Sequence, residues 1–275
     1  MAINKNSNAY IIIYTVVMVV IVGALLAFLA TSLKERQNAN VLNEQKTSIL
    51  KANGEKNANF DEAITVGRIT DGVFVPVEKS EVSKIFELLG DRKALTEAND
   101  NLPIFKREQD GVVKYVLPIV GKGLWGDIWG YVALQQADDN YVVTGIVMDH
   151  AGETPGLGAE IATEKWQKKF AGKMLYGEQG IALEMVKDLS ETAAKGEPSK
   201  VDAITGGTKT CEGVNAMLKT SIGKYESFLR GAEAEAEADV EAESCDEVVA
   251  EECCGECCGE AEAAADVELK NVVEE

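Results

Sequence analysis

An uninterrupted apolar run near the N-terminus is the first strong pattern along the chain. Residues 11–30 are twenty consecutive positions without a charged side chain. At a helical rise of about 1.5 Å per residue, such a run is about 30 Å long, the thickness of the hydrocarbon core of a bilayer. A cleaved signal peptide has a shorter apolar stretch of about 7–15 residues. The pattern therefore predicts an N-terminal segment with a single transmembrane helix over residues 1–33.

Beyond this helix the chain becomes more polar. Residues 34–59 are rich in helix formers and contain no glycine before Gly54, which predicts a helical stalk or linker ending near that residue. A folded domain is expected over 60–230. Its first part is predicted to contain two short strands and an amphipathic helix, at 63–69, 72–77 and 80–89.

The middle of the expected domain is rich in β-branched residues. Short runs of Val, Ile and Tyr separated by glycine or by Asp-Asp-Asn are typical of strands joined by turns. These runs lie at 112–123, 129–134 and 140–149. Helices are expected afterwards at about 162–170 and 211–229, the second with one apolar face. Strands with helices around them predict an α+β fold.

Charge changes the picture at the C-terminal end. The chain has a formal net charge of -19, and residues 231–275 hold 17 of its 46 acidic residues but one of its 27 Lys and Arg. The body is therefore close to neutral and offers no basic surface for nucleic acid. The tail, 231–275, is dominated by Ala and Glu, so it is predicted to be a disordered low-complexity segment.

Cysteine and histidine limit the possible metal chemistry. Five of the six cysteines lie in the tail, and the body has only Cys211, so the body cannot form an internal disulfide. The single histidine, His150, excludes a multi-histidine metal centre. The tail sequence CCGECCGE at 253–260 lacks the further ligands of a known site type. No metal site is predicted.

Three glycine-containing segments are candidates for cofactor chemistry. DAITGGTKT at 202–210 precedes a helix and could bind a phosphate through backbone N–H groups, or form only a loop and helix cap. HAGETPGLGAE at 150–160 offers the Glu153 carboxylate and the Thr154 hydroxyl, or is a plain strand-to-helix connection. GKGLWGDIWG at 121–130 has two tryptophans that could pack on a planar ring, or belong to the core.

Together with the apolar helix, these segments resemble the NqrC family of the sodium-translocating NADH:quinone oxidoreductases over about residues 5–230. In that family the pattern D-x-x-[ST]-G-A-T marks covalent attachment of FMN, through a phosphoester to the last threonine. The pattern falls here on Asp202, Thr205, Gly206, Gly207 and Thr208. The resemblance implies that Thr208 carries the FMN, with Thr210 as the competing acceptor. Gly207 departs from the usual alanine, which makes the loop looser.

The resemblance also implies the remaining assignments. Glu153, Thr154 and Leu157 would contact the isoalloxazine ring or ribityl chain, Trp125 would lie near the ring, and Lys209 would help to bind the cofactor. No catalytic residue is assigned. The protein would pass electrons from NADH towards quinone, coupled to Na+ export, within a six-subunit complex.

A location and further partners follow from the same resemblance. The protein would cross the bacterial inner (cytoplasmic) membrane once, in contact with lipid, with its FMN domain on the periplasmic side. A separate FMN transferase would load the flavin. The charges on either side of the apolar run are nearly balanced, so they do not predict the orientation.

Two alternatives stay open at this point. The RnfG family of the Rnf ferredoxin:NAD oxidoreductase complexes shares the apolar helix, the ETPGLG turn and the flavinylation motif. The long segment before the middle strands and the GKGLWGDIWGY sequence favour the NqrC family instead. A protein of another class, a membrane-tethered binding domain without a redox role, would use the Thr-Gly-Gly-Thr loop only as a helix cap.

Overall fold

The structure, a computed structural model, describes residues 7–55, 58–187 and 197–231. One compact unit ends at Phe228 and contains the helices and strands that are named below. Apart from Gly231, the acidic tail lies outside the described residues. Its disorder stays a prediction.

The N-terminal helix α1 (Asn8–Ala52) is one continuous helix of 45 residues. It is long and apolar enough to cross a membrane, and none of its most apolar 18-residue window is buried in the protein. Its large apolar side chains at 11–33 are exposed, as in a surface that faces lipid. The predicted membrane-spanning segment and the predicted stalk are therefore two parts of the same helix.

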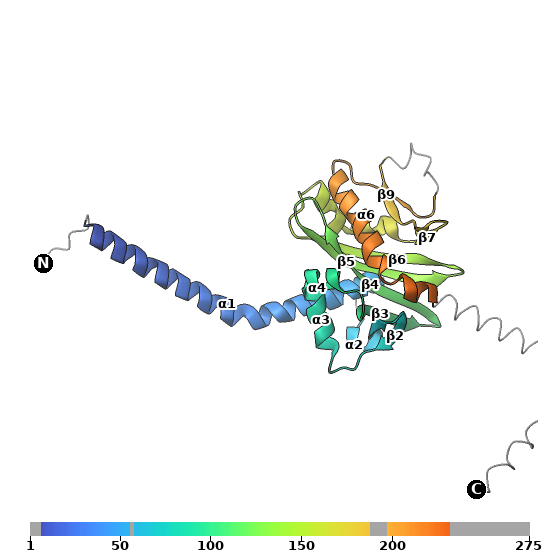
Figure 1. Ribbon diagram of the computed structural model, residues 1–275, viewed down its shortest axis with the longest axis horizontal. Coiled ribbons are helices and arrows are strands. Elements are labelled where there is room, and N and C mark those ends of the chain that lie inside the picture. Colours follow the sequence, from blue (N-terminus) through green and yellow to red (C-terminus); the bar gives the residue numbers. More distant parts are fainter. Residues whose placement is uncertain (1–6, 56–57, 188–196, 232–275) are drawn as a thin grey trace, which may run out of the picture. The chain divides into compact units, whose positions relative to one another are not determined.

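A six-stranded antiparallel sheet forms the centre of the domain, in the order β2-β1-β3-β4-β5-β6 (Figure 1). The strands are β1 (Thr65–Thr70), β2 (Val73–Pro76), β3 (Leu102–Gln109), β4 (Val112–Lys122), β5 (Asp127–Ala137) and β6 (Asn140–His150). Asp-Gly pairs with positive φ at both residues connect β1 to β2 and β3 to β4. This conformation matches the twist of a two-residue hairpin.

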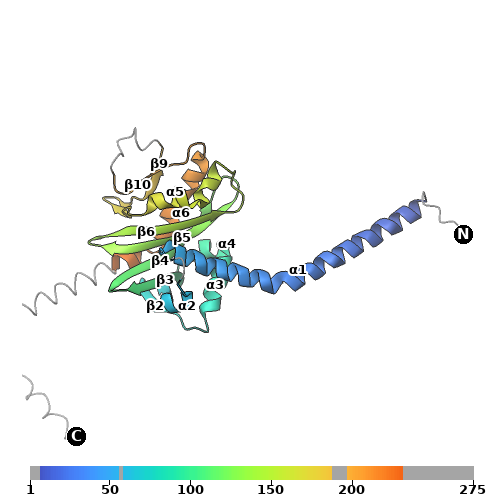
Figure 2. The ribbon, with the colours of Figure 1, turned by 180° about the vertical axis from the view of Figure 1, so that it is seen from behind.

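Helices cover both faces of the sheet (Figure 1). On one face, Val116, Val120 and Tyr131 pack in a core cluster with the end of α1. The helices α2 (Phe60–Ala63), α3 (Val82–Gly90) and α4 (Arg92–Glu97) complete this layer. The end of α1 crosses β6 so closely that a Cβ at Gly145 would collide with the Ala52 carbonyl oxygen (Figure 2).

The helix α6 (Thr208–Gly223) covers the opposite face, against β4. The Ser221 hydroxyl accepts a hydrogen bond from the Val120 amide at 3.0 Å and donates one to its carbonyl at 3.1 Å. These bonds satisfy a part of β4 that extends beyond its pairing with β3. The α6 helix therefore provides hydrogen bonds to β4 beyond Val116, the last of its residues that pairs with β3.

Short elements connect β6 to α6. They are η1 (Gly158–Ala162), α5 (Glu164–Gln167), η2 (Lys168–Phe170), β7 (Tyr176–Gly177), β8 (Gly180–Ile181), β9 (Glu184–Val186) and β10 (Lys200–Asp202). The helix expected at about 162–170 is present as α5 followed directly by η2, and extended backbone at Thr163 separates it from η1.

The α+β fold class is confirmed, while the last helix differs from its expected bounds. The α6 helix begins at Thr208 rather than near 211, because the Cys211 amide already donates to the Gly207 carbonyl at 2.9 Å. It ends at Gly223 rather than near 229. The expected start of the domain at residue 60 stays a prediction, although Ile49 and Leu50 of α1 lie within the core.

Candidate functional site

The three glycine-containing segments of the sequence meet at the start of α6. They form one cavity of about 150 Å³. Its lining comes from the turn between β4 and β5, the segment after β6, and the beginning of α6: Leu124, Glu153, Thr154, Leu157, Gly158, Gly206, Gly207, Thr208, Lys209 and Thr210. Segments far apart in the sequence thus contribute to a single site, as the motifs suggested.

Residues 203–207, which we call the α6 loop, connect β10 to α6. Gly206 has a φ of 78°, a left-handed conformation that favours glycine. The Ile204 amide donates to the Sγ of Cys211 at 3.4 Å. Burial raises the pKa of the Cys211 thiol, so the thiol stays neutral and serves as an internal contact of the loop.

The residues of the flavinylation pattern have different exposures. Asp202, Thr205, Gly206 and Thr208 are exposed, whereas Gly207 is buried. The Asp202 carboxylate lies 3.6 Å from the Lys169 ammonium. Thr208 is therefore accessible from outside the protein.

The first turn of α6 is suited to an anion. Its residues, 208–211, include no acidic side chain, and no side chain of the described residues caps the helix at Gly207. The first amide N–H groups of a helix have no acceptor within the helix, and the helix dipole favours negative charge there. Lys209 adds a cation, although its ammonium is paired with Glu212 at 2.7 Å. This end of α6 fits a phosphate group.

Glu153 joins the three segments of the site. Its side chain is buried, with the residue 4% exposed. One carboxylate oxygen, Oε1, accepts from the Trp125 amide at 2.9 Å, and Oε2 accepts from the Thr210 hydroxyl at 2.7 Å. The Glu153 amide donates to Nδ1 of His150 at 3.1 Å. The geometry gives Glu153 a structural role, and its contact with a flavin stays a prediction.

Two glycines make room for this buried carboxylate. A Cβ at Gly123 would collide with Oε1 of Glu153, and a Cβ at Gly158 would collide with both Oε2 and the Thr210 hydroxyl. A larger residue at Gly123 would displace the Glu153 carboxylate, and one at Gly158 would push Glu153 and Thr210 apart. The sequence analysis did not identify Gly123, Gly158 or Thr210 as partners of Glu153, because only the folded chain brings them together.

Exposed apolar side chains surround the cavity. Outside α1, five large apolar side chains of the described residues are exposed, and three of them lie at or next to this site. They are Leu124 (53% exposed), Trp125 (69%) and Leu157 (41%). Such a cluster marks a binding surface more often than isolated exposed apolar residues do.

The two tryptophans of the 121–130 segment do not act as a pair. Trp125 lies in the turn between β4 and β5, next to the cavity, whereas Trp129 belongs to β5. The guanidinium of Arg92 lies 3.5 Å from the centroid of the Trp129 ring, a cation–π contact. Of the two, only Trp125 is placed to contact a group bound at the start of α6.

The FMN-binding domain family matches residues 123–223, the region that contains the cavity and α6. The NqrC protein of the Na(+)-translocating NADH-quinone reductase from Pseudomonas aeruginosa is 30% identical over 253 residues, which cover 82% of this chain and 96% of that relative. The chain belongs to this NqrC family. The α+β unit is therefore an FMN-binding domain, and the family resemblance seen in the sequence is confirmed.

Other members of the NqrC family show the same relationship. The protein from Pasteurella multocida is 37% identical over 150 residues. The aligned region covers 54% of this chain and 55% of the relative, so the chain spans about half the length of that relative. The crystal structure of the NqrC protein from Parabacteroides distasonis superposes with a TM-score of 0.56 and 28% identity, covering 71% of this chain and 94% of that chain. Neither the Rnf alternative nor the non-redox alternative is favoured by these similarities.

Proposed function

We propose that this chain is the electron-carrying NqrC component of a sodium-translocating NADH:quinone reductase, with FMN attached through its phosphate to Thr208. The position of Thr208 carries this proposal. It is an exposed hydroxyl at the first residue of a 16-residue helix, on the rim of a cavity that apolar side chains surround. The start of the helix would stabilise a phosphate attached there.

The environments of the two candidate threonines favour Thr208 over Thr210. The Thr210 residue is 2% exposed, and its hydroxyl donates to the buried Glu153 carboxylate. Attachment at Thr210 would break this bond and leave a buried carboxylate oxygen without its donor, which is costly. Among the described residues, no hydrogen bond involves the Thr208 side chain, so attachment there would break none.

The small size of the cavity supports a covalent link. Its volume of about 150 Å³ is below the roughly 300–1,000 Å³ of sites that enclose a whole ligand. The isoalloxazine ring is therefore expected to rest outside it, on Leu124, Trp125 and Leu157, near the Thr154 hydroxyl. A cofactor that is not enclosed dissociates easily, and a covalent bond to Thr208 prevents this.

The proposed role divides the chemistry between cofactor and protein. FMN, when bound, supplies one- and two-electron redox chemistry, and the protein binds and orients it. Within the complex, the chain would pass electrons that originate from NADH towards quinone, coupled to Na+ export. The other subunits, a maturing FMN transferase and membrane lipid are its proposed partners. We place the chain in the bacterial inner membrane with its FMN domain in the periplasm.

Flavin fluorescence on a denaturing gel tests this function. Full-length protein made together with an FMN transferase is expected to give a fluorescent band at its own molecular mass, because a phosphoester survives denaturation. Protein made without the transferase is the control and should give no such band. Flavin that is present in the native protein but lost on the gel would contradict covalent attachment.

A further inference from the structure

The two elements that flank the α6 loop, β10 and α6, are not part of the six-stranded sheet. The strand β10 pairs in parallel with the three-residue strand β9, forming a separate two-stranded sheet. The helix α6 packs on β4. Because the loop has five residues, 203–207, the position of Thr208 depends on how β10 and α6 are held relative to each other.

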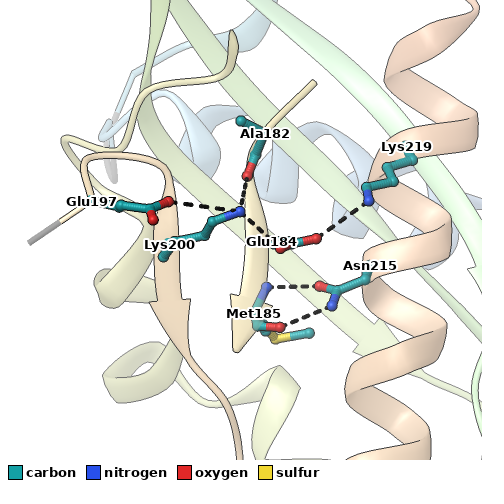
Figure 3. Close-up of polar contacts among 7 residues, drawn as sticks. All are labelled: Ala182, Glu184, Met185, Glu197, Lys200, Asn215 and Lys219. Carbon is teal, nitrogen blue, oxygen red and sulfur yellow. Dashed lines mark hydrogen bonds and ion pairs between the residues drawn. The ribbon is translucent and has the colours of Figure 1, made fainter. Parts of the chain in front are cut away.

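Asn215 ties α6 to β9 through two hydrogen bonds (Figure 3). Its Oδ1 accepts from the Met185 amide at 2.8 Å, and its Nδ2 donates to the Met185 carbonyl at 3.0 Å. The side-chain amide thus binds the strand as a neighbouring strand would. Two bonds of fixed direction limit both the distance of α6 from β9 and its rotation about its own axis.

Glu184 connects β9 to β10 and to α6, the two elements that the α6 loop joins (Figure 3). Its Oε1 accepts from the ammonium of Lys200 in β10 at 2.8 Å. Its Oε2 accepts from the ammonium of Lys219 in α6 at 3.3 Å. One carboxylate therefore links the strand that enters the loop with the helix that leaves it.

Helical spacing places these contacts on the face of α6 that begins with Thr208. Asn215 and Lys219 follow Thr208 by seven and eleven residues. At 3.6 residues per turn, positions so spaced lie within about 20° of Thr208 around the helix axis. Rotation of α6 would therefore displace Thr208 together with the contacts to β9.

We propose that Glu184 and Asn215 are positioning residues that hold Thr208, and hence the attached flavin, in one orientation beside Trp125. This inference rests on the proposed attachment of FMN at Thr208. When the contacts of Asn215 with β9 are lost, the flavin stays covalently bound but its ring moves more freely and stacks less on Trp125.

Fluorescence of the attached flavin in the native, full-length protein tests the inference. Stacking on tryptophan quenches flavin fluorescence, so Asn215→Leu is expected to raise the fluorescence per flavin about twofold and to lower its anisotropy. The matched control is Thr220→Val, an exposed position of α6 whose hydroxyl bonds to Ala216 of its own helix at 2.7 Å. The control should retain the parental fluorescence and anisotropy.

A second variant makes the test independent of folding defects. Lys219→Met alters an exposed side chain and removes only the link of Glu184 to α6, so a smaller change in the same direction is expected. Parental fluorescence and anisotropy in both folded variants would overturn the inference while leaving the proposed function intact. A parent protein without covalent flavin would overturn the proposed function, and this inference with it.

Discussion

A single buried carboxylate holds the candidate flavin site together at the residue scale. Glu153 accepts hydrogen bonds from the Trp125 amide and the Thr210 hydroxyl, in a space that Gly123 and Gly158 leave open. These groups come from three segments of the chain. The backbone at Trp125 is therefore coupled to the first turn of α6.

Replacing Glu153 should destabilise the domain. Glu153→Ala leaves the partly buried Trp125 amide and the buried Thr210 hydroxyl without an acceptor, and each loss costs up to about 1–3 kcal/mol. We expect the free energy of unfolding to fall by about 2–5 kcal/mol, measured by urea denaturation in detergent. Glu153→Gln keeps an acceptor for Trp125, so it should lose less than half as much. Equal stability of the alanine variant and the parent would contradict the role of Glu153.

The sequence motifs could predict which segments form the site but not how their side chains pair. The order of the three motifs indicated that Thr208, Glu153 and Trp125 belong together. The Glu153–Thr210 hydrogen bond joins residues 57 positions apart, and no local pattern signals such a contact. Asn215 likewise looks like an ordinary polar position of an amphipathic helix until β9 is seen beside it.

At the element scale, prediction succeeded where a strand is long and rich in β-branched residues. The strands β4, β5 and β6 are long and rich in β-branched residues, and each was expected from its sequence. The strand β3 was missed because Ile104 is its one β-branched residue and its last four residues are charged or polar, so its composition does not indicate a strand. The strands β9 and β10 have three residues each, too few for any periodicity.

The contacts of β9 with its neighbours should make stability depend on pH. The hydrogen bond from Lys200, and then that from Lys219, lowers the pKa of Glu184 below its ordinary value of 4.5. A carboxyl with a lowered folded-state pKa contributes stability that is present above 4.5 and is lost as pH falls through its folded-state pKa. Because Glu184 is partly exposed, we expect a contribution of about 1 kcal/mol or less.

Urea denaturation between about pH 5 and pH 3 measures this contribution. The stability of the parent should exceed that of Glu184→Gln at the upper end of this range and approach it at the lower end. If the free energy of unfolding changed with pH by the same amount in both proteins, protonation of Glu184 would not be coupled to unfolding.

At the scale of the whole molecule, α1 serves two environments. Its exposed apolar residues at 11–33 are suited to lipid, whereas Ile49 and Leu50 near its end belong to the core of the FMN-binding domain. A single helix therefore connects the proposed anchor directly to the folded core. The sequence pattern separated these parts into a span and a linker because burial of the last turn depends on the distant sheet.

Two truncations distinguish these functions of α1. Removing residues 1–33 should move the protein from the membrane fraction to the soluble fraction without lowering its resistance to urea. Removing residues 1–59 should also lower the free energy of unfolding, because burial of a large aliphatic side chain such as Ile49 or Leu50 contributes about 1.5–3 kcal/mol. A soluble fraction containing the full-length chain, or equal stability of the two truncated proteins, would contradict this account.

Peptide mass mapping of the full-length protein, made with an FMN transferase, tests the attachment of FMN at Thr208. Trypsin cleaves after Lys200 and Lys209, so Thr208 and Thr210 fall in different peptides. The account predicts a flavin phosphate adduct on the peptide 201–209, fragmentation that assigns it to Thr208, and no adduct in Thr208→Ala. An adduct on the peptide that begins with Thr210, or undiminished flavin in Thr208→Ala, would contradict it.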